Sequence, residues 1–289
     1  MDEPVLVSVI IPTYRDWQRL QQCLGALAHQ SMLDKEYEVV VVNNDPDDAP
    51  PAGWCLPKNV RMLQERKPGA YAARNAGLKA ARGQFLAFTD SDCLPQPDWL
   101  THGIAALVAD NADRVAGCIE VLSDNKKMTP TECYESLFAF DQPQNVTRGV
   151  GVTANLLARA NLFDTVGMFN EDLLSGGDIE WNRRATAMGY TIRYCQQAVV
   201  GHPARRTWSE MARKVRRTTG GKLAINPQYR LTIFRSLCPP LEASAHIARQ
   251  DGAFLRTRML AFWVAYRIKV FRYFYFRKLK SGRCAAERG

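Results

Sequence analysis

Two runs of apolar, mostly β-branched residues limit what this chain can fold into. LVSVIIP (residues 6–12) ends at a proline, and YEVVVVNND (residues 37–45) shows no alternation of polar and apolar side chains. A strand that is covered on both faces, as in a parallel sheet, has this continuous apolar character. Between the two runs, Leu20, Leu24 and Leu27 recur at helical spacing. The sequence therefore predicts parallel strands connected by helices.

The same alternation continues through the first 90 residues. Residues 60–63 and 85–89 read as two more strands, and the Ala-rich segment 69–83 between them reads as a helix bracketed by glycines. This order predicts a three-layer α/β domain with a mainly parallel sheet. Ligands of such sheets bind at the carboxyl ends of the strands. Beyond residue 98 the pattern predicts helices at 99–109 and near 133–140, a strand at 114–121, and a last strand that ends at His202.

Two acids, Asp90 and Asp92, follow the fourth predicted strand in FLAFTDSDCLP. In an extended segment, residues i and i+2 point the same way, so both carboxylates could approach one cation. Carboxylates, together with water and phosphate oxygens, are typical ligands of Mg²⁺ or Mn²⁺. An Asp-x-Asp triplet is also common in solvated loops, and the spacing alone leaves that alternative open. The sequence contains neither a dinucleotide-binding glycine motif nor a P-loop, so a bound phosphate would have to be held by a metal.

Five blocks, in chain order, resemble the motifs of the family 2 glycosyltransferases, which have the GT-A fold. They are VSVIIPTYR, VVVVNNDPDD, PGAYAARNAGLKAARGQFLAFTDSDCLPQPDWL, TANLLARANLFDTVGMFNEDL and GGDIEWNRRATAMG. The resemblance covers roughly residues 5–202. It implies a GT-A catalytic domain over residues 1–204. It further implies an inverting hexosyltransferase, of the bacterial cell-envelope or polysaccharide type, that moves a sugar from a UDP, GDP or dTDP sugar to a hydroxyl group of a glycan or lipid-linked acceptor.

The resemblance also implies where the donor and the metal bind. The nucleotide-sugar residues that it implies are Pro12, Thr13, Tyr14, Asn43, Arg74 and Asp90. Asn43 stands where the family usually has an aspartate that binds the base, which leaves the identity of the base open. Asp92 and Asp90 would together hold Mg²⁺ or Mn²⁺ and the diphosphate, with Asp92 as the more direct ligand and Asp90 nearer the ribose. His202 would complete the metal shell, although a lone histidine can equally be structural.

On the acceptor side, the resemblance implies that Asp178 is the general base, because an attacking hydroxyl must lose its proton. The family usually has Glu before this Asp, whereas this chain has Gly177. Asp178 could instead be only a helix N-cap, and Glu180 is then the reserve candidate for the base. Trp181 is expected either to stack on a sugar or to belong to the core. Asn155 lies in the segment that matches the acceptor side.

The eight cysteines and the N-terminus bear on the cellular location. The cysteines are scattered, with no CxxC pair and no Cys/His cluster at zinc spacing, which favours reduced thiols in a cytosolic setting. The N-terminus opens with the acids Asp2 and Glu3 and lacks the features of a signal peptide. We therefore expect a cytoplasmic protein, peripheral at the inner face of the cell membrane.

The C-terminal region, residues 205–289, is predicted to be a basic helical extension. Although the whole chain has a net charge of +9, residues 205–280 alone hold 18 Lys and Arg against three Asp and Glu. This asymmetry predicts contact with an anionic surface, either lipid or nucleic acid, although a solvated basic face is the simpler alternative. An apolar stripe at helical spacing lies within it, formed by Met259, Phe262, Trp263, Tyr266, Val270 and Tyr273.

This stripe is flanked by Arg256, Arg258, Arg267, Lys269 and Arg272. The combination is typical of a helix that lies in a membrane interface, and we expect residues 255–280 to bind anionic lipid. The charges interrupt every stretch long enough to span a bilayer. Alternatively, the stripe could pack on the catalytic domain.

Three other functions are compatible with parts of the sequence. They are a nucleotidyltransferase on a related sheet, a nucleic-acid-binding protein and a catalytically silent binding module. Nucleic-acid binding requires salt-sensitive association and leaves the five blocks unexplained, so we consider it the weaker interpretation.

Overall fold

The structure is a computed structural model that describes residues 5–123, 127–248 and 254–285. Asp2 and Glu3, which entered the interpretation of the N-terminus, lie outside these residues. The chain divides into two compact units. The α/β unit consists of Met1–Glu120, Asp141–Asp172 and Gly177–His202, and the helical unit consists of Val121–Phe140, Leu173–Gly176 and Pro203–Gly289. Each unit is described by itself below.

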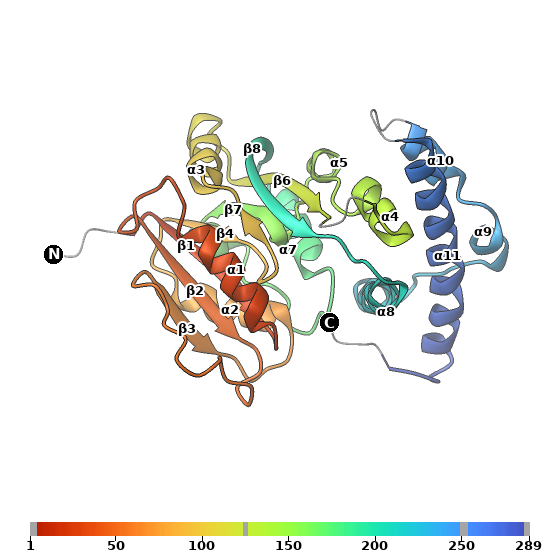
Figure 1. Cartoon of the computed structure of the whole chain (residues 1–289), viewed down its shortest axis with the longest axis horizontal. Helices are drawn as coiled ribbons and strands as arrows, with labels where there is room; N and C mark the ends of the chain where they lie inside the picture. The colour runs from red at the N-terminus through yellow and green to blue at the C-terminus, as the bar shows by residue number, and fades with distance from the viewer. Residues whose placement is uncertain (1–4, 124–126, 249–253, 286–289) are drawn as a thin grey trace. The chain divides into compact units, whose positions relative to one another are not determined.

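A mixed sheet with flanking helices forms the α/β unit (Figure 1). The strand order is β3-β2-β1-β4-β7-β6-β8-β5. The strands are β1 (Val7–Thr13), β2 (Tyr37–Asn43), β3 (Val60–Gln64), β4 (Phe85–Phe88), β5 (Leu94–Pro95), β6 (Arg114–Leu122), β7 (Leu156–Arg159) and β8 (Ile192–Pro203). The helices are α1 (Trp17–Leu27), α2 (Ala70–Ala80), α3 (Trp99–Ala109), α5 (Gln142–Thr147), the short 3₁₀ helix η1 (Thr153–Asn155), α6 (Leu162–Thr165) and α7 (Gly177–Ala187).

The half of the sheet built from β3, β2, β1 and β4 is parallel, as predicted from the apolar runs. Every residue of β1 and β2 is buried, which explains why neither strand alternates. Helix α2 packs on one face of these strands, where Ala73 contacts Val40 and Val42. Gly77 of α2 lies so close to β1 that a Cβ atom there would be 2.6 Å from the Cγ2 atom of Ile10. The predicted α/β fold is therefore confirmed in this half of the sheet.

Beyond β4 the sheet is antiparallel. β7 pairs with β4 and with β6, and the two-residue strand β5 pairs with β8. The β5–β8 register places Leu94 opposite Gly201. This pairing joins the segment directly after the two acids to the end of β8, so it brings together two parts of the chain that are distant in sequence.

The helical unit contains α4 (Pro130–Phe138), α8 (Trp208–Ile225), α9 (Ile233–Leu237), α10 (Leu241–Ala248) and α11 (Leu255–Lys280). Helix α4 starts earlier than predicted because Thr129 and Glu132 form a capping box at its N-terminus. An apolar cluster joins α8 to α11 through Met211, Val215, Val264 and Ile268. The guanidinium of Arg267 also lies 3.8 Å from the ring centre of Trp208.

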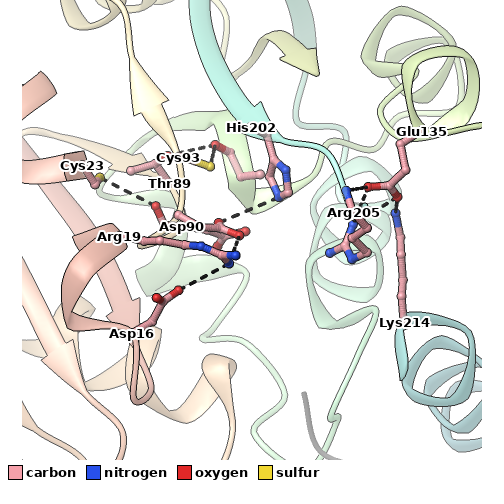
Figure 2. Close-up of polar contacts among 12 residues, drawn as sticks. Asp16, Arg19, Cys23, Thr89, Asp90, Cys93, Glu135, His202, Arg205 and Lys214 are labelled. Carbon is pink, nitrogen blue, oxygen red and sulfur yellow. Dashed lines mark hydrogen bonds and ion pairs between the residues drawn. The ribbon is translucent and has the colours of Figure 1, made fainter. Parts of the chain in front are cut away.

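A buried glutamate in the helical unit pairs with two cations. Glu135 is 1% exposed. Its carboxylate accepts hydrogen bonds from Lys214 Nζ at 2.7 Å and from Arg205 Nη1 at 3.0 Å (Figure 2). Burial by itself opposes the charge of this carboxylate, but the two cations outweigh that effect and lower the pKa of Glu135.

Helix α11 forms where the sequence predicts a helix, but a different face of it is buried. Ala261, Val264, Ile268, Tyr275 and Phe276 are buried. Of the predicted stripe, Tyr273 is buried, whereas Met259 and Trp263 are 56% and 61% exposed. The predicted stripe is therefore divided between a buried part and an exposed part. Among the described residues, no helix combines the length and the apolar character needed to cross a membrane.

Candidate functional site

The segment after β4 is a turn and not the extended strand that we assumed for the two acids. The backbone N–H of Cys93 donates to the carbonyl of Asp90 at 3.1 Å, so Ser91 and Asp92 occupy the central positions of a β-turn. The argument from alternating side chains was therefore wrong at this point. The turn nevertheless leaves the carboxylates of Asp90 and Asp92 close together.

Four side chains converge at this turn. One ligand atom each of Asp90, Asp92, Cys93 and His202 lies within 4.8 Å of the others. Figure 2 shows His202 at the end of β8, beside the turn that carries Asp90 and Cys93. The pairing of Leu94 with Gly201 explains this arrangement, because the residues next to that pair, Cys93 and His202, are then neighbours across the two strands.

The donor set suits a divalent cation. Carboxylates are ligands of Mg²⁺ and Mn²⁺, and an imidazole nitrogen is accepted by the first-row transition metals. His202 is 4% exposed, and its Nε2 atom lies 3.8 Å from Asp92 Oδ1. The Cys93 thiol is a softer ligand. Its burial, and then the charges of Asp90 and Asp92, raise its pKa, which keeps it protonated.

Two arginines balance the acids of the turn. Arg74, on α2, is 4% exposed and donates through Nη2 to Asp90 Oδ1 at 2.5 Å. Arg19, on α1, lies 3.8 Å from Asp92 Oδ2 and 3.7 Å from Asp16 Oδ2 (Figure 2). Each carboxylate of the turn thus faces one guanidinium, which reduces their mutual repulsion.

The end of β1 contributes the predicted segment Pro12, Thr13 and Tyr14. Pro12 and Thr13 are buried, whereas Tyr14 is 39% exposed. Within the residues that the structure describes, Thr13 Oγ1 and Arg74 Nε are buried without a hydrogen-bond partner. Buried polar atoms are nearly always paired, so two unpaired ones among the expected nucleotide residues fit a site that a polar ligand completes.

Asn43 ends β2 and is 2% exposed. Its Nδ2 atom donates to the carbonyl of Asp48 at 2.9 Å, and its Oδ1 atom accepts from the backbone N–H of Asp45 at 2.9 Å. The Asn43 amide therefore stabilises the conformation of the loop after β2. The neighbouring Asn44 does the same for the segment before α2, because its Oδ1 atom accepts from Gly69 N at 2.7 Å.

Asp178 is the second residue of α7 and is half-buried. Its Oδ1 atom accepts from the Tyr71 hydroxyl at 3.0 Å, and its Oδ2 atom lies 3.4 Å from the backbone nitrogen of Thr153. The reserve candidate Glu180 forms an ion pair with Arg184, with Oε1 2.7 Å from Arg184 Nε. That guanidinium also donates to the carbonyls of Val166 and Met168. Glu180 is thus engaged in supporting a loop, whereas within the described residues the structure shows no ion pair for the carboxylate of Asp178.

The structure corrects two acceptor-side assignments. Trp181 is 0% exposed, is stacked on Phe163 at 4.4 Å and donates from Nε1 to the carbonyl of Gly167 at 2.7 Å. It is a core residue and cannot stack on a sugar. Asn155 is also 0% exposed. Its amide binds Trp99 Nε1 at 2.8 Å and the carbonyls of Cys118 and Ala198, so it ties strands together and cannot reach an acceptor.

Sequence reasoning missed Arg19, Tyr71 and Cys93. Tyr71 could have been found, because it lies one helical turn before Arg74 on the same face of a predicted helix. Cys93 is too far from His202 in sequence for a ligand spacing to pair the two residues. All eight cysteines lie in the described part of the chain and are free thiols.

Comparisons with known proteins agree with this geometry. The family description Glycosyl transferase family 2 matches residues 8–155. Glycosyltransferase AglE of Haloferax volcanii is 33% identical over 225 residues, which cover 76% of this chain and 73% of AglE. The uncharacterized glycosyltransferase EpsJ of Bacillus subtilis is 26% identical over 199 residues, which cover 62% of this chain but only 56% of EpsJ.

Two solved structures share the fold. The mannosyltransferase PcManGT from Pyrobaculum calidifontis, in complex with GDP-Man and Mn²⁺, is 19% identical with a TM-score of 0.57, covering 96% of this chain and 88% of that chain. S. aureus TarS 1-349, in complex with UDP-GlcNAc, is 19% identical with a TM-score of 0.54, covering 96% and 92%. The sheet, the family match and the identity to AglE lead to one conclusion: the chain belongs to glycosyl transferase family 2 and is a glycosyltransferase with the GT-A fold.

Proposed function

We propose that the α/β unit is an inverting, metal-dependent hexosyltransferase that moves a sugar from a nucleotide-diphosphate donor to a hydroxyl group of a glycan or lipid-linked acceptor. One observation carries this proposal: ligand atoms of Asp90, Asp92 and His202 lie within 4.8 Å of one another at the end of β4. Such a set of oxygen and nitrogen donors is suited to Mg²⁺ or Mn²⁺.

In this proposal Asp92, Asp90 and His202 would hold the cation, and Asp90 would also face the donor. When bound, the cation would neutralise the charge of the departing diphosphate. Arg74 already holds Asp90, and its buried Nε atom has no partner within the described residues, so it offers a donor for a phosphate or ribose oxygen. Thr13 Oγ1 offers a second buried polar atom at the end of β1.

The proposed donor is a nucleotide-diphosphate sugar, whose diphosphate would bind the metal. PcManGT is described with GDP-Man and TarS with UDP-GlcNAc, which supports a donor of this class. The amide of Asn43 is engaged with the loop after β2. We therefore propose that the base is bound mainly by the neighbouring backbone and by the segment Pro12–Tyr14, and UDP, GDP and dTDP sugars are the donors to test.

Asp178 is the proposed general base. Its carboxylate would accept the proton of the acceptor hydroxyl while that oxygen bonds to the anomeric carbon and the bond to the diphosphate breaks. A single displacement of this kind inverts the anomeric configuration. The ion pair of Glu180 with Arg184 supports Asp178 over Glu180 for this role.

The test combines binding and turnover. A thermal-shift screen of UDP, GDP and dTDP sugars, each with Mg²⁺ or Mn²⁺, identifies the donor, and product formation with that donor then measures transfer. We expect stabilisation by one donor in the presence of metal, and loss of both stabilisation and transfer in Asp92→Asn. Undiminished transfer by Asp92→Asn would contradict the metal site.

We also propose that the helical unit binds an anionic membrane surface from the cytoplasmic side. Exposed apolar side chains at the start of α11 support this: Phe254 is 82% exposed, Leu255 74%, Met259 56% and Trp263 61%. Helix α11 also carries many Lys and Arg residues, and each cation near an anionic membrane contributes about 1 kcal/mol to binding.

An open, shallow depression of about 370 Å³ adds to the apolar surface of the helical unit. It lies between α10 and α11, and Ile247, Met259, Phe262 and Trp263 line it together with Ser244 and Arg258. Its walls are therefore mostly apolar, with one cation. A membrane-bound helical unit would hold the enzyme at the surface where a lipid-linked acceptor is found.

A further inference from the structure

Three groups fix the carboxylate of Asp178 in the α/β unit. The Tyr71 hydroxyl and the backbone N–H of Ile179 donate to Oδ1 at 3.0 and 2.9 Å. The N–H of Thr153 is the only donor to Oδ2 that the structure shows within the described residues, and its 3.4 Å separation makes it a weak one. The hydrogen bonds to Oδ1 thus fix the orientation of the side chain, and Oδ2 can accept a further hydrogen bond.

The ring of Tyr71 lies directly against Gly177, the residue before Asp178. A Cβ atom at Gly177 would be 2.8 Å from both Cδ2 and Cε2 of Tyr71. Gly177 has no positive φ angle, so its backbone conformation alone does not require glycine. Any side chain at this position would have to displace the ring. This accounts for the departure from the Glu-Asp pair that is usual at the resembling motif.

We propose that Tyr71 is a positioning residue of the transfer reaction, which holds Asp178 Oδ1 so that Oδ2 faces the acceptor hydroxyl, and that Gly177 is glycine in order to admit the Tyr71 ring. This inference rests on the proposed function, in which Asp178 is the general base.

Toward the Asp178 carboxylate, the Tyr71 hydroxyl is the donor. Tyr71 is 6% exposed. Burial, followed by the negative charge of Asp178, raises the pKa of this hydroxyl, so it stays protonated while the carboxylate is charged. Hydrogen bonds to a charged acceptor are stronger than neutral ones, which suits a group that must hold a carboxylate in one orientation.

Tyr71 also links the two ends of the site through α2. The guanidinium of Arg74 lies 5.4 Å from the centre of the Tyr71 ring, and Arg74 in turn holds Asp90. Asn75, the next residue of the same helix, exchanges hydrogen bonds with the backbone of Phe169, whose ring packs 5.8 Å from that of Tyr71. One helix therefore sets the position of the base relative to the acid on the donor side.

The first test removes the hydroxyl and keeps the ring. In Tyr71→Phe we expect kcat to fall about 10- to 100-fold, the loss expected from a hydrogen bond to a charged group. The KM for the donor should not change, because Arg74 and Asp90 remain in place. Tyr190→Phe is the matched control. In the described part of the chain its hydroxyl has one hydrogen-bond partner, Thr165 Oγ1 at 2.9 Å, which lies outside the site, and we expect wild-type kcat.

The second test uses the contact between Gly177 and the ring. Gly177→Ala should lower kcat in the wild-type background, because the added methyl group displaces Tyr71. In a Tyr71→Leu background, where no ring is present, the same change should have a much smaller effect. Such non-additivity is the mark of two residues that act through direct contact.

The outcomes separate this inference from the proposed function. If Asp178→Asn abolishes transfer while Tyr71→Phe retains kcat within twofold, the positioning role is wrong and the base assignment stands. If Tyr71→Phe raises the donor KM as strongly as it lowers kcat, Tyr71 supports donor binding and the inference is likewise overturned. If Asp178→Asn retains full activity, the base assignment itself fails, and the role proposed for Tyr71 fails with it.

Discussion

Two functional surfaces were predicted: the carboxyl edge of the sheet in the α/β unit and helix α11 in the helical unit. In the structure the predicted residues come together at the first surface but are divided at the second. At the sheet edge, Asp90, Asp92 and His202 are brought together, and Asp90 is bonded to the buried Arg74. On α11, the predicted apolar stripe is split, since Tyr273 is buried while Met259 and Trp263 are exposed.

The difference follows from how many ways each element can pack. When a strand is buried on both faces, both of its neighbouring layers are filled. The residues that follow the strand must therefore lie at the carboxyl end of the sheet, where ligands bind. A helix of 26 residues with aromatic side chains on several faces can bury any of them. Strand ends are therefore better guides to a site than an apolar stripe on a long helix.

The largest expected effect concerns the α/β unit. Asp178→Asn should lower kcat by roughly 10²- to 10⁴-fold, the usual contribution of a general base. Glu180→Gln, two residues away, should reduce kcat far less, since Glu180 supports a loop through Arg184. Steady-state transfer assays with saturating donor measure both. A larger loss in Glu180→Gln than in Asp178→Asn would reverse the assignment.

The next prediction tests whether Trp181 of α7 is a core residue or an acceptor-binding residue. Trp181→Ala should destabilise the protein by about 3–5 kcal/mol, the usual cost of removing a fully buried aromatic side chain. The exposed Phe274 of α11 is the matched aromatic control, and Phe274→Ala should change stability by less than about 0.5 kcal/mol. Chemical denaturation followed by fluorescence and circular dichroism gives both values. A stable Trp181→Ala protein with a raised acceptor KM would restore the acceptor role.

A third prediction concerns how the stability of each unit depends on pH. The pKa of Glu135 is lowered below its ordinary value of 4.5, so its ion pair stabilises the folded state above that pH, and the contribution is lost as the pH falls through the folded-state value. Glu135→Gln leaves Lys214 and Arg205 without their acid and should cost about 3 kcal/mol.

Glu38 is the counterpart of Glu135 in the α/β unit. It is buried, and although burial opposes its charge, hydrogen bonds from Ser8 and Arg82 lower its pKa below the same ordinary value. We expect Glu38→Gln to flatten the acid-induced loss of stability in the α/β unit and Glu135→Gln to do so in the helical unit. Unfolding from pH 7 to pH 3 checks this. An unchanged acid profile in both variants would contradict it.

The smallest effect on stability is expected for the proposed membrane surface. Met259→Ser with Trp263→Ser should change the free energy of unfolding by less than about 0.5 kcal/mol per site, because both side chains are exposed. The same double variant should lose most of its binding to anionic vesicles in co-sedimentation. Met188→Ser, an equally exposed methionine at the end of α7, is the control and should bind normally.

Two results would contradict the membrane proposal. The first is equal sedimentation of the double variant and the wild type with anionic vesicles. The second is salt-sensitive binding to oligonucleotides without any binding to vesicles, which would assign the basic residues to nucleic acid.

The sequence by itself determined the α/β class and the parallel half of the sheet. It also placed Asp90 and Asp92 directly after a strand, and Asp178 at the start of a helix. These follow from local pattern, because apolar runs, helical spacing and strand ends are properties of short segments. The sequence also predicted a helix that contains the stripe from Met259 to Tyr273, which lies within α11 (Leu255–Lys280).

Only the tertiary structure decided which of these side chains meet and which are buried. Cys93 and His202 are neighbours because β5 pairs with β8, and Tyr71 reaches Asp178 because α2 packs beside α7 at Gly177. Trp181 and Asn155 matched the acceptor-side segments in sequence, yet both are fully buried and bonded inside the sheet and its helices. Burial and long-range contact depend on how distant segments pack, and no short stretch of sequence carries that information.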